Sequence, residues 1–170
     1  MTQIHPSEFA DLRVRYHDKK IIYCAGTFDL IHPGHAIFLE NCKKYGDILV
    51  VSVGSDANVK RNKKPDLPIM NQYMRLKMID SLKPVNFCFI SEHSPVHHPL
   101  EFLNIAFSTL RPDVYVINRD VADITYRKEV AMKYKVQLIL LDRECAPEFE
   151  NVSTTKLIEK IKQLPRQPPD

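Results

Sequence analysis

Residues 26–35 read GTFDLIHPGH, and they join two segments with different hydrophobic patterns. The preceding run Lys20–Ala25 is short and apolar, which predicts a buried strand. The following segment Pro33–Tyr45 carries apolar residues on one side of a helical repeat. Proline is favoured at the first position of a helix, because its missing N–H costs nothing there. The sequence therefore predicts a strand, a turn and a helix around residues 26–35.

Strand-like and helix-like segments alternate along the rest of the chain. Apolar runs predict further strands over Asp47–Val53, Val85–Ile90, Asp113–Ile117 and Val136–Leu141. Helical spacing predicts helices over Met70–Leu82, Leu100–Leu110, Val121–Tyr134 and Ser153–Leu164. A charged loop is expected over Asp56–Pro68. Because this alternation is typical of right-handed βαβ crossovers, we expect an α/β, Rossmann-like fold with a parallel five-stranded sheet and helices on both faces. Ligands of such sheets bind at the carboxyl ends of the strands.

The domain organisation follows from where this pattern starts and stops. Residues 1–19 are mostly polar and are expected to form an N-terminal extension, helical or loosely packed. Residues 20–164 hold the whole alternating pattern and are expected to form one domain, a size that a single core supports. Residues 165–170 contain three prolines and are expected to form a flexible tail.

Composition and charge narrow the class of partner. The chain has a net charge of +3, and 44% of its residues are hydrophobic, which is ordinary for a globular protein. A general nucleic-acid binder usually carries a dense basic stripe, so we expect no nucleic-acid partner. A local excess of positive charge suits a small polyanion instead, and it consists of Lys60, Arg61, Lys63 and Lys64.

We expect a cytoplasmic protein with no membrane partner. The first residues lack the basic and apolar regions of a signal peptide. No apolar run approaches the roughly 18 residues that a membrane span needs. Four cysteines without a CxxC pair are interpreted as reduced, with those in apolar runs packed in the core. They are Cys24, Cys42, Cys88 and Cys145.

The turn at residues 26–35 has the features of an anion site. The N–H groups and dipole of a helix start attract negative charge, and Gly34 lets a phosphate approach the backbone. His32 and His35 are three residues apart, so their imidazoles share a face. Two such rings can bind phosphate oxygens and stabilise the charge that grows in an in-line displacement. The alternative is that both histidines only cap or pack. The chain has neither a GxxxxGK[ST] nor a GxGxxG motif.

GTFDLIHPGH resembles the GTFD and HxGH signature of the cytidylyltransferase-like nucleotidyltransferase superfamily, and the resemblance covers roughly residues 20–163. It implies the nucleotidyltransferase fold, with His32 and His35 as catalytic residues. It also implies that five residues of this run contact the nucleotide, namely Gly26, Thr27, Phe28, Gly34 and His35. Asp29 is expected either at the acceptor substrate or in a structural role in the turn.

A second run, Ser153-Thr154-Thr155, resembles the carboxyl-terminal signature of the same family. Hydroxyl and N–H groups at a helix start can bind phosphate oxygens, and a plain helix cap is the alternative. These three residues are therefore expected at the nucleotide.

The resemblance also implies cations at the two substrates. Family members have a lysine in the loop before the helix predicted over Met70–Leu82 and an arginine on that helix, and both neutralise phosphates. Arg75 fits the arginine, and Lys60 is favoured among the lysines of residues 60–64, whose register stays open. Lys60 and Arg75 are expected to be catalytic and acceptor-binding. Arg143 would contact the triphosphate, although about nine residues separate it from Ser153. Cations are needed because repulsion between two phosphorylated substrates opposes their approach.

One turn departs from the family pattern. Relatives carry a glycine-containing turn after the fourth strand, whereas this chain has Asn118-Arg119-Asp120. Asp120 would match the acidic residue near the nucleotide, and the missing glycine indicates an altered substrate or base pocket. His93, His97 and His98 have no carboxylate or cysteine at ligand spacing, so no protein-held metal is expected. Mg²⁺ is expected as the companion of the triphosphate.

The expected reaction joins a nucleoside monophosphate from ATP or CTP to a phosphorylated small molecule and releases pyrophosphate. Residues 55–85 look like heptose-phosphate adenylyltransferases of ADP-heptose synthesis, whereas GTFDLIHPGH and VSTTKLIEKI look like glycerol-3-phosphate cytidylyltransferase. A sugar-phosphate acceptor is slightly favoured, and the base stays open. Archaeal-type FAD synthetases are a further alternative, and so is a nucleotide-binding regulatory domain without turnover. A homodimer is expected, because relatives often dimerise.

Overall fold

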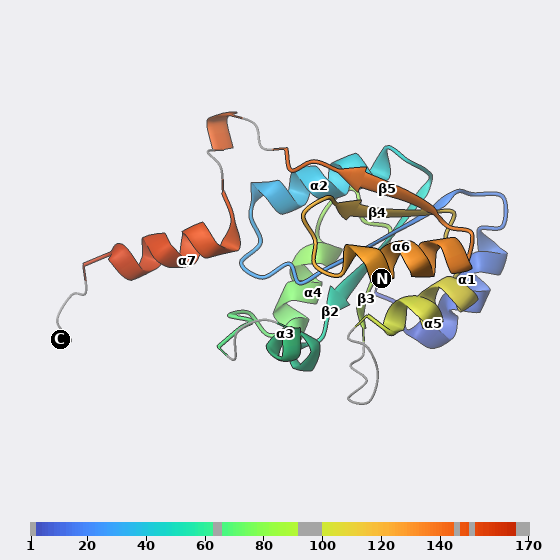
Figure 1. The fold of residues 1–170 in the computed structure, drawn as a ribbon, viewed down its shortest axis with the longest axis horizontal. Helices are drawn as coiled ribbons and strands as arrows, with labels where there is room; N and C mark the ends of the chain where they lie inside the picture. The colour runs from blue at the N-terminus through green and yellow to red at the C-terminus, as the bar shows by residue number, and fades with distance from the viewer. Residues whose placement is uncertain (1–2, 63–65, 92–99, 145–146, 150–151, 166–170) are drawn as a thin grey trace.

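The computed structural model describes residues 3–62, 66–91, 100–144, 147–149 and 152–165. Its centre is one sheet of five parallel strands in the order β3-β2-β1-β4-β5 (Figure 1). The strands are β1 (Ile21–Gly26), β2 (Ile48–Gly54), β3 (Phe87–Ser91), β4 (Val114–Asn118) and β5 (Gln137–Leu141). All five predicted strands are confirmed, with ends that differ by one or two residues.

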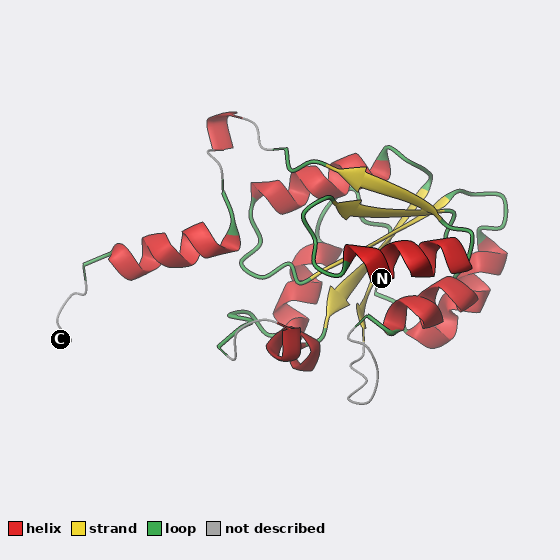
Figure 2. Ribbon diagram, in the orientation of Figure 1, coloured by secondary structure: helices red, strands yellow, loops and turns green. Residues whose placement is uncertain are grey.

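Helices cover both faces of the sheet, as predicted, and Figure 2 shows them in red around the yellow strands. One face packs against α1 (Phe9–Arg15), α5 (Phe102–Thr109) and α6 (Ile124–Lys133). The other face packs against α2 (Pro33–Lys43) and α4 (Gln72–Asp80). Because both faces are covered, the strands are continuously apolar rather than alternating, and six of the seven residues of β2 are buried.

The N-terminal residues pack against the sheet. Phe9 of α1 is fully buried, and its ring meets the ring of Phe89 edge-on, with 4.9 Å between centroids. A one-turn 3-10 helix (Pro6–Glu8) precedes α1, and the Ile4 N–H donates to the Cys88 carbonyl at 3.0 Å. This segment therefore adds to the core beneath α5.

The charged-loop prediction for residues 56–62 is wrong, because these residues form helix α3 (Asp56–Asn62). The Ser55 hydroxyl accepts a hydrogen bond from the Asn58 N–H at 3.3 Å and so caps the helix start. Val59 is buried and anchors the helix to the sheet. One buried apolar residue is too weak a periodic signal to recognise in the sequence.

Helix α4 presents an unexpected face to solvent. Met74 and Met78, whose spacing marks the helix in the sequence, are 51% and 40% exposed. The buried residues of this helix are Arg75, Leu76 and Ile79. An arginine therefore occupies the interior of the fold, and its partners are described below.

The remaining elements lie near the carboxyl end of the chain. A short 3-10 helix (Pro147–Phe149) follows β5, and α7 (Thr154–Gln163) projects away from the sheet in Figure 1 without a buried residue. Cys24, Cys42 and Cys88 are buried free thiols, whereas Cys145 lies outside the described residues. Within the described ranges, no helix combines the length and the apolar character needed to cross a membrane.

The strand order reverses between β1 and β4. The chain runs from β1 outward to β3 and then crosses back to place β4 on the other side of β1. Helix α2, which follows β1, covers one face, and α6, which follows β4, covers the other. The divergent connections leave a crevice at the carboxyl edge of these strands, which is where ligands of such sheets bind.

Candidate functional site

A cavity of about 720 Å³ opens at this crevice. It is lined by the carboxyl ends of β1, β2, β3 and β4, the start of α2, the loop that enters α6 and the start of α7. Of the sequence-predicted site residues, the structure brings to this cavity Gly26, Thr27, Phe28, Asp29, His32, Gly34, His35, Asp120, Arg143, Ser153, Thr154 and Thr155. It brings neither Lys60 nor Arg75 there.

Gly26 and Phe28 shape the turn after β1. Phe28 has a positive φ of 54°, a conformation that folds its ring back over Gly26. A Cβ atom at Gly26 would lie 2.8 Å from that ring, which is closer than carbon atoms approach. Glycine is therefore required at this position so that the turn can be tight.

His32 and His35 lie face to face at the start of α2. Their ring centroids are 3.9 Å apart with an interplanar angle of 30°, so the spacing argument for a shared face is confirmed. The His32 N–H lies 3.4 Å from Nδ1 of His35, and the His35 N–H donates to the His32 carbonyl at 2.9 Å. A Cβ atom at residue 34 would lie 3.1 Å from the His32 ring, so glycine at this position leaves room for that ring. Their catalytic role stays a prediction.

The environment of His32 favours its neutral form. Burial lowers the pKa of His32, and the positive charge of Arg143 lowers the pKa further. Nδ1 of His32 is buried and has no hydrogen-bond partner among the described residues. Nδ1 is enclosed beside Gly34, where a Cβ atom would lie 3.1 Å from it.

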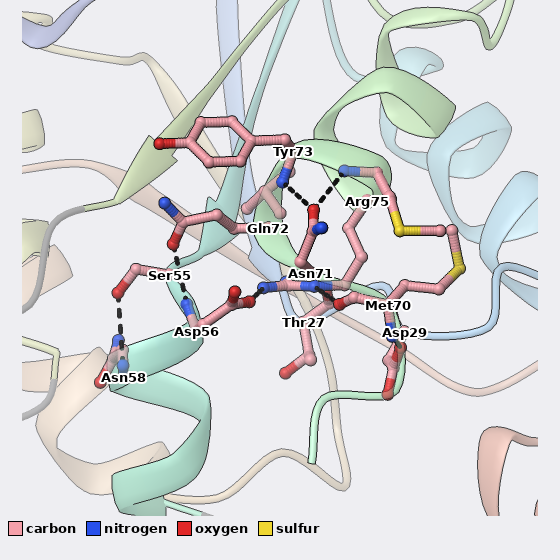
Figure 3. Close-up of polar contacts among 12 residues, drawn as sticks. Thr27, Asp29, Ser55, Asp56, Asn58, Met70, Asn71, Gln72, Tyr73 and Arg75 are labelled. Atoms are coloured by element: carbon pink, nitrogen blue, oxygen red, sulfur yellow. Dashed lines mark hydrogen bonds and ion pairs between the residues drawn. The ribbon is translucent and has the colours of Figure 1, made fainter.

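Asp29 connects three segments of the site, and Figure 3 shows it beside Met70 of one of them. Its carboxylate accepts hydrogen bonds from the Ile69 N–H at 2.7 Å and the Met70 N–H at 2.9 Å. Its backbone carbonyl accepts a hydrogen bond from the Thr154 hydroxyl at 2.8 Å. Asp29 is 4% exposed. It therefore holds the loop before α4 and the start of α7 against the β1 turn.

Arg75 is fully buried and is bound by the protein itself. Nε donates to the Met70 carbonyl at 2.9 Å, one terminal nitrogen to the Thr27 carbonyl at 2.7 Å, and the other to the Asp56 carboxylate at 2.7 Å (Figure 3). Arg75 thus links α3 and α4 to the turn that carries the histidines. It contributes no surface to the cavity, in contrast to the expected contact with substrate phosphate.

The described lysine of this segment, Lys60, is likewise not at the cavity. Lys60 is exposed near the end of α3 and does not line the cavity. Lys63 and Lys64 lie outside the described residues, as do His93, His97 and His98. Among the residues that are described, no group of three or more His, Cys, Asp or Glu side chains could hold a metal ion.

Two ion pairs lie where β4 and β5 end. Arg143 pairs with Asp120 at 2.6 Å, and both side chains are more than half exposed. Arg119 pairs with Asp142 at 3.0 Å. The unusual turn after β4 is therefore tied to the turn after β5, and the partner that Arg143 has here is a carboxylate, which a triphosphate would have to displace.

The start of α7 forms another wall of the cavity. The Ser153 hydroxyl accepts a hydrogen bond from the Lys156 N–H at 3.3 Å and caps the helix. Thr154 is held by Asp29, and Thr155 is exposed at the cavity. Both the capping role and the position near a phosphate site therefore fit this run.

The sequence reasoning did not single out several cavity residues. Ser52 and Ser91 line the cavity from the ends of β2 and β3, and Arg127 lines it from α6. Ser52 interrupts the apolar run ILVVSVG, and this was a usable signal. Arg127 has no comparable signal, because it is one of many charged residues on its helix.

The crevice at a strand-order switch, the helix start and the paired imidazoles are features of a site that suits an anionic ligand. Residues 23–160 match the family model described as cytidylyltransferase-like. The chain therefore belongs to the cytidylyltransferase-like family and is an enzyme of the nucleotidyltransferase type.

Two curated relatives illustrate the likeness. The chain is 36% identical over 149 residues to the bifunctional protein HldE of Campylobacter jejuni strain RM1221, covering 88% of this chain and 29% of that protein. It is 34% identical over 147 residues to the FAD synthase of Ferroglobus placidus, covering 86% of this chain and 90% of that protein. The chain thus spans less than a third of the HldE length.

Solved structures support the fold. A lipopolysaccharide core biosynthesis protein from Thermoplasma volcanium is similar with a TM-score of 0.60 and 23% identity, covering 75% of this chain and 98% of that one. A pantoate-beta-alanine ligase from Francisella tularensis has a TM-score of 0.62 and 14% identity, covering 99% of this chain and 80% of that one. At these identities the likeness shows the fold alone.

Proposed function

We propose that this protein transfers a nucleoside monophosphate from ATP or CTP to a phosphorylated sugar or polyol and releases pyrophosphate. The observation that carries the proposal is the stacked pair His32 and His35 at the wall of the switch-point cavity. The similarity to HldE favours ATP and a heptose-phosphate type of acceptor.

The chemistry needs positioning more than covalent participation. A phosphate oxygen of the acceptor attacks the α-phosphorus in line, and the bond from that phosphorus to the pyrophosphate oxygen breaks. His32 and His35 donate hydrogen bonds to the oxygens on which negative charge grows, while the start of α7 receives the leaving group. The neutral state favoured for His32 leaves one N–H to donate.

Mg²⁺ belongs to this proposal as the companion of the triphosphate, where it neutralises phosphate charge. In this proposal the metal is held by the nucleotide's own oxygens. Asp120 and Asp142 lie at the same mouth and could contact the hydrated ion.

A second candidate activity is flavin adenylylation, which the similarity to an archaeal FAD synthase of nearly the same length favours. Glycerol-3-phosphate-type cytidylyl transfer and nucleotide binding without turnover are further alternatives from the sequence. Each differs from the leading proposal in the triphosphate, the acceptor or the presence of turnover.

One screen separates these functions. Pyrophosphate release is measured with each of four nucleoside triphosphates against phosphorylated sugars, polyols, amino alcohols and flavin mononucleotide, in the presence of Mg²⁺. We expect turnover with ATP and a sugar phosphate. Turnover with flavin mononucleotide would select the second activity, and tight nucleotide binding without turnover would overturn the catalytic proposal. The homodimer and the cytoplasmic location remain predictions, and light scattering measures the former.

A further inference from the structure

The part of the cavity under α6 contains small polar groups. Ser52 and Ser91 are 2% and 7% exposed, and they lie at the ends of neighbouring strands. Leu100 closes the same region before α5. This region lies on the face of the sheet opposite α2 and its histidines. It is therefore suited to a second substrate that approaches the nucleotide from the other side.

Arg127 carries a positive charge into this region. Nε donates to the Ala122 carbonyl at 3.0 Å, and one terminal nitrogen donates to the Tyr115 hydroxyl. Both partners are neutral, and no carboxylate among the described residues forms an ion pair with Arg127. By contrast, carboxylates do pair with Arg75, Arg119 and Arg143. A guanidinium has five N–H groups, so Arg127 keeps donors for a ligand.

Two fully buried tyrosines lie beneath Arg127, which is itself half-buried. Tyr23 and Tyr115 are fully buried with ring centroids 5.7 Å apart. The Tyr23 hydroxyl has no hydrogen-bond partner within the described part of the chain, although Ser52 is beside it. Burial raises the pKa of Tyr115, and the charge of Arg127 opposes this rise. The positive charge of Arg127 therefore acts on a tyrosine that is shielded from water, where the dielectric constant is low.

Arg143 lies on the histidine side of the cavity and not beside Ser52 and Ser91. The described lining residues include two arginines, Arg127 and Arg143. Arg143 acts on the pKa of His32 and so lies on the histidine side. If His32, His35 and Arg143 hold the triphosphate, the phosphate of the acceptor still needs a cation of its own.

We propose that Arg127 binds the phosphate of the acceptor substrate and that its neighbours Tyr115 and Ala122 hold the guanidinium in position. This inference rests on the proposed function, because it assigns one of its two anionic substrates. It transfers to α6 the acceptor-binding role that the sequence suggested for Arg75. A bidentate contact explains why an arginine is present, since a planar guanidinium matches two phosphate oxygens.

The test compares Arg127→Gln with wild type in two binding assays that need no turnover. Calorimetry first measures the affinity for a non-hydrolysable ATP or CTP analogue with Mg²⁺. Inorganic phosphate is then titrated into protein saturated with that analogue. We expect analogue affinity to stay within about twofold and phosphate affinity to fall roughly ten- to hundredfold, the usual range for losing a charged hydrogen-bond donor. Arg127→Lys should recover part of the loss.

Two controls make the result specific. Lys128→Gln removes an exposed cation of the same helix that does not line the cavity, and it should leave both affinities unchanged. Thermal unfolding of each variant identifies any loss that follows from misfolding, and the Lys variant keeps the test valid if the Gln variant unfolds. Equal phosphate affinity in wild type and folded Arg127→Gln would overturn the proposal, and so would an equal loss of analogue affinity.

The same variants separate this inference from the proposed function. In the turnover screen, Arg127→Gln should raise the KM of the acceptor at least about tenfold with little change in the KM of the triphosphate. A chain that shows no turnover with any pair, yet loses phosphate binding on Arg127→Gln, would refute the function and keep the anion site.

Discussion

Replacing Arg75 by methionine tests whether this arginine supports the fold or contacts substrate. The change keeps a long side chain but removes three hydrogen bonds, to Thr27, Met70 and Asp56. The Asp56 side chain is 32% exposed and can be rehydrated, whereas the Arg75 side chain is fully buried among its partners.

The magnitude follows from these contacts. Removing one partner of a buried charged pair costs about 3–5 kcal/mol, and each buried acceptor left unsatisfied accounts for about 1–3 kcal/mol of such a loss. We therefore expect Arg75→Met to lower the free energy of unfolding by about 3–5 kcal/mol. For a chain of this size that corresponds to a fall in Tm of roughly 6–20 °C.

Urea unfolding followed by circular dichroism, together with calorimetry, measures the change. Lys77→Met on the exposed side of the same helix is the matched control and should stay within about 0.5 kcal/mol of wild type. An Arg75→Met protein that unfolds like wild type but has lost activity would refute the structural reasoning and restore the expected phosphate contact.

Three further predictions concern the turn and its histidines. His35→Ala should lower kcat by about 10²–10³ while its unfolding curve stays close to wild type, and near-normal turnover would remove it from the mechanism. Gly26→Ala should cost about 1–3 kcal/mol in urea unfolding, because the new methyl group would lie 2.8 Å from the Phe28 ring. NMR titration should give His32 a pKa below its ordinary value of about 6.5, and Arg143→Met should raise it. Because this pKa is lowered on folding, the stability contributed by His32 is present above about pH 6.5 and is lost as the pH falls through the folded-state value; an identical acid limb of the stability curve in His32→Gln would contradict this.

The elements with strong local patterns could be predicted from the sequence. The apolar runs identify all five strands, and their alternation with helices implies the parallel sheet. The turn at residues 26–35 could be predicted because its glycines, proline and histidines act within ten consecutive positions. Its distant anchors leave no mark on this local pattern: Ile69, Met70 and Thr154 bind Asp29, and Arg75 binds the Thr27 carbonyl.

The roles of the arginines could not be predicted in the same way. Arg75 is buried because its acceptors come from residues 27, 56 and 70, which meet only in the folded chain. The spacing of Met74 and Met78 predicted the helix α4, yet both side chains face solvent. Arg127 forms no ion pair with a carboxylate of the described residues, unlike Arg143 in the same cavity, and such partners are set by tertiary packing.

The hydrogen bond from Thr154 to Asp29 spans 125 positions. Every strand of the sheet precedes Thr154 in the sequence, and α7 contains no buried residue. The core therefore does not depend on the segment that completes the cavity. A chain cut just before Ser153 should remain a folded α/β protein that lacks the cavity wall formed by Ser153, Thr154 and Thr155.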